Sequence, residues 1–162
     1  MGNEDYSRLI DRIKQVFDSV QSPGDENILG APEHVQSCGE CSLLQTALVG
    51  RKWQDLADDE SSSGYVSHAM SFFSPSGWHY YLPAYLIQTV KGRTFTSMYF
   101  QTRIGTIGRE MLEKRMKLLT RDQCRVIIAY LLIVLRENRS TQSEVDSNVE
   151  AVTYWKQMCQ EL

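Results

Sequence analysis

The chain has 162 residues, of which 42% are hydrophobic and 23% are charged, and its net charge is −3. This composition is typical of one soluble globular domain, and the acidic balance argues against a nucleic-acid partner. No apolar run approaches the roughly 18–20 residues that cross a bilayer, and the N-terminus lacks an apolar signal region. We therefore expect a cytoplasmic protein that does not bind membranes. Four cysteines are too few for a secreted disulfide scaffold, so free thiols are expected.

The first third of the chain predicts short helices separated by polar breaks. Residues 3–20 place apolar side chains at intervals of three and four, which indicates an amphipathic helix. A second helix is predicted from Glu40 to Val49, with Gly50 following it in the position of a C-cap. Residues 51–56 add one further turn, in which Trp53 and Leu56 face inward. A flexible internal loop is predicted over 58–64, and a helix over 65–73.

An aromatic segment lies near the middle of the sequence. Residues 71–87 contain two Phe, one Trp, three Tyr and two Pro, so this segment must lie in or beside the core. Ser74 followed by Pro75 predicts an N-cap and the first residue of a helix. That helix carries Trp78, Tyr81 and Tyr85 on one side. Pro83 lies within it and predicts either a kink or an interruption.

The second half predicts further helices and no sheet. Residues 94–102 have strand propensity but no second strand to pair with, which favours irregular or helical structure. A helix is predicted over 107–119. Its end and the next segment carry basic residues interleaved with acidic ones, which indicates a solvated helix face. The basic residues are Lys114, Arg115, Lys117, Arg121 and Arg125.

The most apolar segment follows a capping box. Thr120 is predicted as the N-cap and Gln123 as its partner at the third helical position. Residues 124–135 are apolar on nearly all sides, which is typical of a buried central helix. A final helix is predicted over 143–162, with Val149, Val152 and Cys159 on its apolar stripe. The sequence therefore predicts a single all-α domain over 1–162, with about six helices around a buried apolar helix near 122–136.

The sharpest chemical motif is His34-x-x-x-Cys38-Gly-Glu-Cys41. These three side chains could supply three zinc ligands, and a structural site would need a fourth. The cysteine pair is similar to that of zinc deaminases, but the upstream His-x-Glu which that chemistry requires is absent. Two thiols at a helix start could also serve redox chemistry, although the thioredoxin context is missing. The remaining alternative is that both cysteines are small buried residues.

Evidence for other catalytic chemistry is weak. His68 and His79 flank the aromatic segment, but no nucleophile and orienting carboxylate accompany them. No nucleotide-binding loop or nucleophile elbow is present. The aromatic segment instead suggests anchors for a binding partner, for which Trp78, His79, Tyr81 and Tyr85 are the candidate residues.

The order of motifs resembles a bacterial family of unknown function. The matching residues are Pro23-Gly24-x-x-Asn27-Ile28, Cys38-x-Glu40-Cys41, Gly50-x-x-Trp53-x-x-Leu56 and Phe73-Ser74-Pro75-x-Gly77-Trp78-x-x-Tyr81-Leu82-Pro83-Ala84-Tyr85. The resemblance runs from about residue 8 to residue 135. It implies a small, mostly helical bacterial protein and no particular reaction.

Three functional hypotheses follow. The first is a non-enzymatic module without a cofactor that binds another protein, for example an immunity-type or accessory protein of a bacterial system. The second is a zinc-binding domain or metal-dependent enzyme that uses His34, Cys38 and Cys41, with Glu40 as a nearby acid or base. The third is a thiol-redox protein that uses the same two cysteines. The sequence favours a protein without enzymatic activity.

Overall fold

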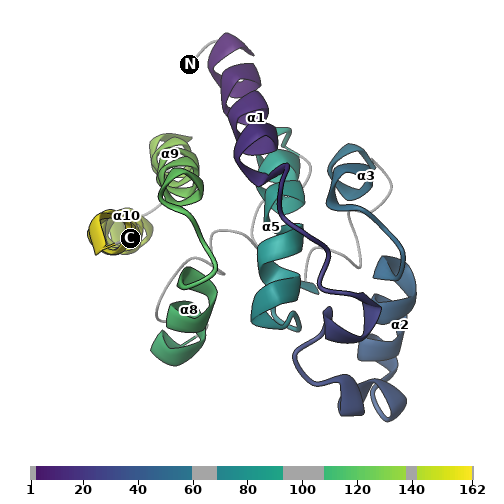
Figure 1. Cartoon of the computed structure of the whole chain (residues 1–162). Coiled ribbons are helices and arrows are strands. Elements are labelled where there is room, and N and C mark those ends of the chain that lie inside the picture. Colours follow the sequence, from purple (N-terminus) through teal and green to yellow (C-terminus); the bar gives the residue numbers. More distant parts are fainter. Residues whose placement is uncertain (1–2, 60–68, 93–107, 138–141, 162) are drawn as a thin grey trace.

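The computed structural model describes residues 3–59, 69–92, 108–137 and 142–161, and over these residues the chain is all-α, as predicted (Figure 1). Two short 3-10 helices, η1 and η2, precede the second α-helix. Of the helices described, none is both long and apolar enough to cross a membrane. The elements are α1 (Asn3–Phe17), η1 (Asp25–Asn27), η2 (Pro32–Gln36), α2 (Gly39–Leu48), α3 (Trp53–Asp58), α5 (Pro75–Val90), α8 (Arg109–Met116), α9 (Arg121–Glu137) and α10 (Gln142–Glu161).

Helix α5 is the most deeply buried element. Every residue from Tyr80 to Gln88 is buried, and α1, α3, α8 and α9 pack around it. Figure 1 shows α5 between α3 on one side and α8 and α9 on the other. The sequence placed the buried centre near 122–136 instead. Helix α9 covers that range and packs on α1 and α10, but Leu132 is 45% exposed, so one side of α9 faces solvent.

The start of α5 is fixed by a cap that also joins it to the preceding loop. The Ser74 hydroxyl accepts a hydrogen bond from the Gly77 N–H at 2.9 Å, which confirms the predicted N-cap. The same hydroxyl donates to the Asn27 carbonyl at 2.5 Å. Beside this contact, an isolated antiparallel bridge pairs Leu29 with Phe73. The helix then continues through Pro83 without interruption.

Buried polar groups on α5 bind the ends of α2 and α3. The Tyr81 hydroxyl lies 3.0 Å from both the Leu48 and the Arg51 carbonyl oxygens, where α2 ends. The Gln88 amide donates to the Leu56 carbonyl of α3 at 2.6 Å. Because the last carbonyls of a helix have no partner within the helix, these bonds satisfy them and fix both helices against α5.

Gln123, in the first turn of α9, makes similar connections to α1 and α5. Its side-chain oxygen accepts from the Thr120 N–H at 3.0 Å, and its own N–H donates to the Thr120 hydroxyl at 3.3 Å, which confirms the capping box. Its amide nitrogen donates to the Val16 carbonyl at 3.0 Å, near the end of α1. That bond orients the amide, so the His79 Nε2, 3.1 Å from the Gln123 oxygen, must be the donor. Gln123 thus joins α1, α5 and α9.

One member of the predicted solvated face is buried. Arg115 is 1% exposed, and its guanidinium lies 5.2 Å from the centre of the Trp78 ring and donates to the Met70 carbonyl at 3.0 Å. Burial lowers the pKa of Arg115 to about 10. The prediction failed because Arg115 shares a helix face with buried Leu112 and Met116, which local charge patterning does not reveal. The other four basic residues of the segment are exposed.

Several predicted boundaries shift. Helix α1 ends at Phe17 rather than at residue 20, and α8 is shorter than the predicted 107–119. Helix α3 includes Asp58, and Asp59 pairs with Arg51 at 2.7 Å, so the start of the predicted 58–64 loop is ordered by these contacts. Residues 60–64 lie outside the described part of the chain, as do residues 94–102 and 138–141.

Two helix predictions need correction. Residues 70–72 form a turn and Phe73 forms the bridge to Leu29, so no helix extends to residue 73; residues 65–68 lie outside the described part. In α10, Val152 and Cys159 are buried as predicted, but Val149 is 52% exposed. The apolar stripe of α10 therefore follows Ala151, Val152, Trp155 and Cys159.

Replacing Gly77 with alanine tests the close approach between α5 and the preceding loop. A Cβ at Gly77 would lie 2.1 Å from the Ile28 carbonyl oxygen, so the backbone has to move. We expect Gly77→Ala to lower the free energy of unfolding by about 3 kcal/mol or more in denaturant titrations. Gly39→Ala is the matched control, because nothing lies within 4 Å of a Cβ there and it also starts a helix. Equal stability of the Gly77 variant and the wild type would contradict this packing.

Candidate metal centre

The predicted metal-ligand motif lies where η2 meets α2. His34 is in η2, and its carbonyl accepts hydrogen bonds from the Ser37 N–H at 3.1 Å and the Cys38 N–H at 2.8 Å. Cys38 is the N-cap residue of α2, and its carbonyl accepts from the Ser42 N–H at 3.0 Å. The backbone therefore turns sharply between His34 and Cys41 and returns the side chains to one place.

The structure brings the three predicted ligands together. The ligand atoms of His34, Cys38 and Cys41 all lie within 4.8 Å of one another. In a tetrahedral zinc site the ligand atoms are about 3.5–3.8 Å apart, given Zn–S distances of about 2.3 Å and Zn–N distances of about 2.0–2.1 Å. Rotation of exposed His34 and half-buried Cys38 can close this difference, while Cys41, 4% exposed, anchors the cluster. Both cysteines are free thiols.

The two thiols differ in acidity. The pKa of Cys38 is lowered, chiefly through the backbone N–H of Cys41 and then through the Cys41 thiol. The pKa of Cys41 is raised, chiefly by burial and then by its contact with Cys38. The thiolate is the form that binds metals and attacks electrophiles, so the start of α2 prepares Cys38 for either role.

Glu40 is not one of the three converging groups. It is exposed in the first turn of α2, between the two cysteines in sequence. Its role as an acid or base stays a prediction. The convergent cluster found among the described residues comprises His34, Cys38 and Cys41.

The aromatic candidates lie in the core. Trp78 and Tyr85 are 0% exposed and Tyr81 is 1% exposed, while His79 is partly buried and bonded to Gln123. Burial raises the pKa of Tyr81 and of Tyr85 and lowers that of His79. The three aromatic rings thus fill the interior rather than line a surface. A role in partner binding stays a prediction for these four residues.

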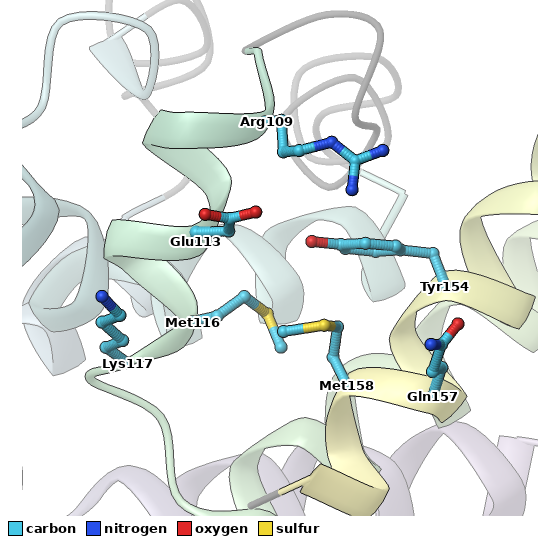
Figure 2. Close-up of a pocket in the computed structure, with 7 residues that line it drawn as sticks. All are labelled: Arg109, Glu113, Met116, Lys117, Tyr154, Gln157 and Met158. Carbon is cyan, nitrogen blue, oxygen red and sulfur yellow. The ribbon is translucent and has the colours of Figure 1, made fainter.

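A group of residues that the sequence did not single out lines a pocket between α8 and α10 (Figure 2). Arg109, Glu113 and Lys117 recur every four residues in the sequence, a spacing that predicts one side of a helix; the first two lie in α8 and Lys117 is its C-cap residue. This spacing was a usable signal. The sequence could not show that α10 faces them, because that arrangement depends on packing between distant segments.

Comparison with known families identifies one match to the chain. The chain belongs to the family of unknown function DUF6714, which matches residues 5–159. The match confirms membership of an uncharacterised family. It extends beyond the resemblance seen in the sequence, which ran from about residue 8 to residue 135. It assigns no reaction to the chain. No curated protein and no solved structure shows significant similarity to the chain.

Alkylation of metal-free protein tests the difference between the thiols. We expect the rate of Cys38 alkylation by iodoacetamide to reach half its plateau at a lower pH than that of Cys41, because the pKa of Cys38 is lowered and the pKa of Cys41 is raised. Peptide mass spectrometry across a pH series gives both midpoints. The pH midpoint reports the acidity of each thiol, whereas the absolute rate also depends on how exposed the thiol is. A Cys41 midpoint at or below that of Cys38 would contradict the assignment.

Proposed function

We propose that this protein binds zinc through His34, Cys38 and Cys41. The observation that supports the proposal most strongly is the convergence of the three ligand atoms to within 4.8 Å of one another. A neutral imidazole and two thiolates form a donor set that suits zinc, whereas calcium and magnesium prefer oxygen ligands. The lowered pKa of Cys38 adds support, since a metal-binding thiol must lose its proton.

Three protein ligands leave one tetrahedral position for a further ligand. Sites with three protein ligands and a water in the fourth position are typical of catalytic zinc, whereas structural sites have four. Exposure of His34 and partial exposure of Cys38 give the fourth position access to solvent. The proposed centre is therefore an accessible zinc ion that takes water or an external donor, and it would also fix η2 against the start of α2.

Zinc analysis of purified variants tests the proposal. We expect about one zinc ion per chain in the wild type by elemental analysis and native mass spectrometry. His34→Ala, Cys38→Ser and Cys41→Ser should each lower the bound zinc or abolish it, because two remaining ligands hold zinc poorly. Cys159→Ser is the matched control, since Cys159 lies in α10 and outside the cluster. Full zinc occupancy in the Cys38 and Cys41 variants would refute the site, as would a wild type that takes up no zinc on reconstitution.

A thiol-redox role is the second candidate. It is supported by the contact between a thiol of lowered pKa, Cys38, and one of raised pKa, Cys41. This asymmetry suits an attacking and a resolving thiol. Oxidised glutathione should then convert the pair to a disulfide with the loss of two hydrogen atoms, and dithiothreitol should reverse it. Persistence of both free thiols, measured by mass spectrometry after this treatment, would exclude the redox role and leave the zinc proposal intact.

The interaction-module hypothesis stays a prediction. Some large apolar side chains are exposed on the described surface, each between 40% and 53%, and they suit a protein partner without specifying one. An immunity or accessory role, a bacterial origin and a cytoplasmic location likewise stay predictions. The exposed apolar residues are Leu43, Val49, Leu118, Leu132 and Val149.

A further inference from the structure

Helices α8 and α10 enclose a pocket of about 620 Å³, a volume within the usual range for small-molecule sites. Figure 2 shows the Glu113 carboxylate of α8 and the Tyr154 hydroxyl of α10 pointing toward one another across it. The pocket is remote from the proposed zinc site, because α5 lies between α8 and α2 (Figure 1). Its chemistry is therefore independent of zinc.

One part of the lining is apolar and adaptable. The thioether groups of Met116 and Met158 lie next to each other, and the Tyr154 ring lies above them (Figure 2). Met116 is 2% exposed, and Met158 and Tyr154 are partly buried. Methionine side chains are polarizable and pack well against aromatic or aliphatic groups. This part of the pocket suits the apolar body of a ligand.

The other part carries charged side chains: Arg109 and Glu113 lie on successive turns of α8, and Lys117 follows the helix as its C-cap residue. Arg109 and Glu113 are exposed, and neither forms an ion pair within 4.0 Å with a residue in the described ranges. On another side of the same helix, Lys114 does pair with Glu110 at 2.9 Å.

We propose that this pocket binds a small zwitterion with an apolar body, the chemical class of a large apolar amino acid. The Cβ atoms of Arg109 and Glu113 are about 5–6 Å apart, as for any i,i+4 pair, so their charges can flank adjacent ligand groups. The ligand carboxylate meets the Arg109 guanidinium, which suits bidentate binding. The ligand ammonium meets the Glu113 carboxylate, and the body lies against Met116, Met158 and Tyr154.

Three probes with one phenyl body test the charge requirement by isothermal titration calorimetry. L-phenylalanine carries both charges, 3-phenylpropionate lacks the ammonium and phenethylamine lacks the carboxylate. We expect saturable binding of phenylalanine with a Kd below about 1 mM, and about tenfold weaker binding of each singly charged probe. No saturable binding of phenylalanine up to about 10 mM overturns the proposal, and so does equally tight binding of a singly charged probe.

Variants assign the contacts and provide controls. Glu113→Gln should weaken phenylalanine binding about tenfold and should not weaken 3-phenylpropionate binding, since that probe has no ammonium. Arg109→Ala should likewise weaken phenylalanine binding about tenfold. It should not weaken phenethylamine binding, since that probe has no carboxylate. Lys114→Ala and Glu110→Gln are the matched controls on the same helix and should alter no affinity, because this ion pair does not line the pocket. All four residues, Arg109, Glu110, Glu113 and Lys114, are exposed, so these variants should fold. Unchanged phenylalanine binding in the Arg109 and Glu113 variants overturns the assignment.

Discussion

The structure depends on the burial of most of α5, because polar side chains on a buried helix are stabilised by partners inside the protein. Tyr81, Gln88 and His79 find theirs on α2, α3 and α9. These hydrogen bonds satisfy the three side chains and also position the neighbouring helices against α5. Gly77 permits a close approach between α5 and the loop at Ile28, since a side chain there would overlap the Ile28 carbonyl.

This arrangement explains where the proposed zinc site lies. The C-terminal end of α2 is held by the Tyr81 hydroxyl, and the following Gly50 N–H donates to the Asp25 carboxylate at 3.0 Å. The N-terminal end of α2 carries Cys38 and Cys41, and the backbone there lowers the pKa of the Cys38 thiol. The C-terminal end of α2 is thus firmly packed, while the N-terminal end, where the proposed zinc site lies, is accessible to solvent. Buried Cys41 links the two, while exposed His34 can adjust to a bound ion.

What the sequence could predict was mostly local. The Ser74 cap and the Thr120–Gln123 capping box depend on residues three apart, and both are confirmed. The convergence of His34, Cys38 and Cys41 was foreseeable for the same reason, because eight residues around one turn contain all three.

Features set by long-range packing were not foreseen. The burial of Arg115 against Trp78 and the pocket between α8 and α10 each require two segments far apart in the sequence to meet. The sequence did place residues 71–87 in or beside the core, which is confirmed. Helix periodicity shows which side of a helix is apolar. It does not show which helix covers that side, so the sequence placed the buried centre in the range of α9 rather than at α5.

The central claim is that zinc is bound by one imidazole and two thiolates. X-ray absorption at the zinc edge of the zinc-loaded protein tests this most directly, because it reports ligand types and distances without requiring an enzymatic reaction. For zinc bound by His34, Cys38 and Cys41, we expect two sulfur neighbours at about 2.3 Å and lighter neighbours at about 2.0–2.1 Å. One of the lighter neighbours should show the outer-shell pattern of imidazole. A first shell made only of oxygen and nitrogen would show that the zinc is bound elsewhere, and would contradict binding by Cys38 and Cys41.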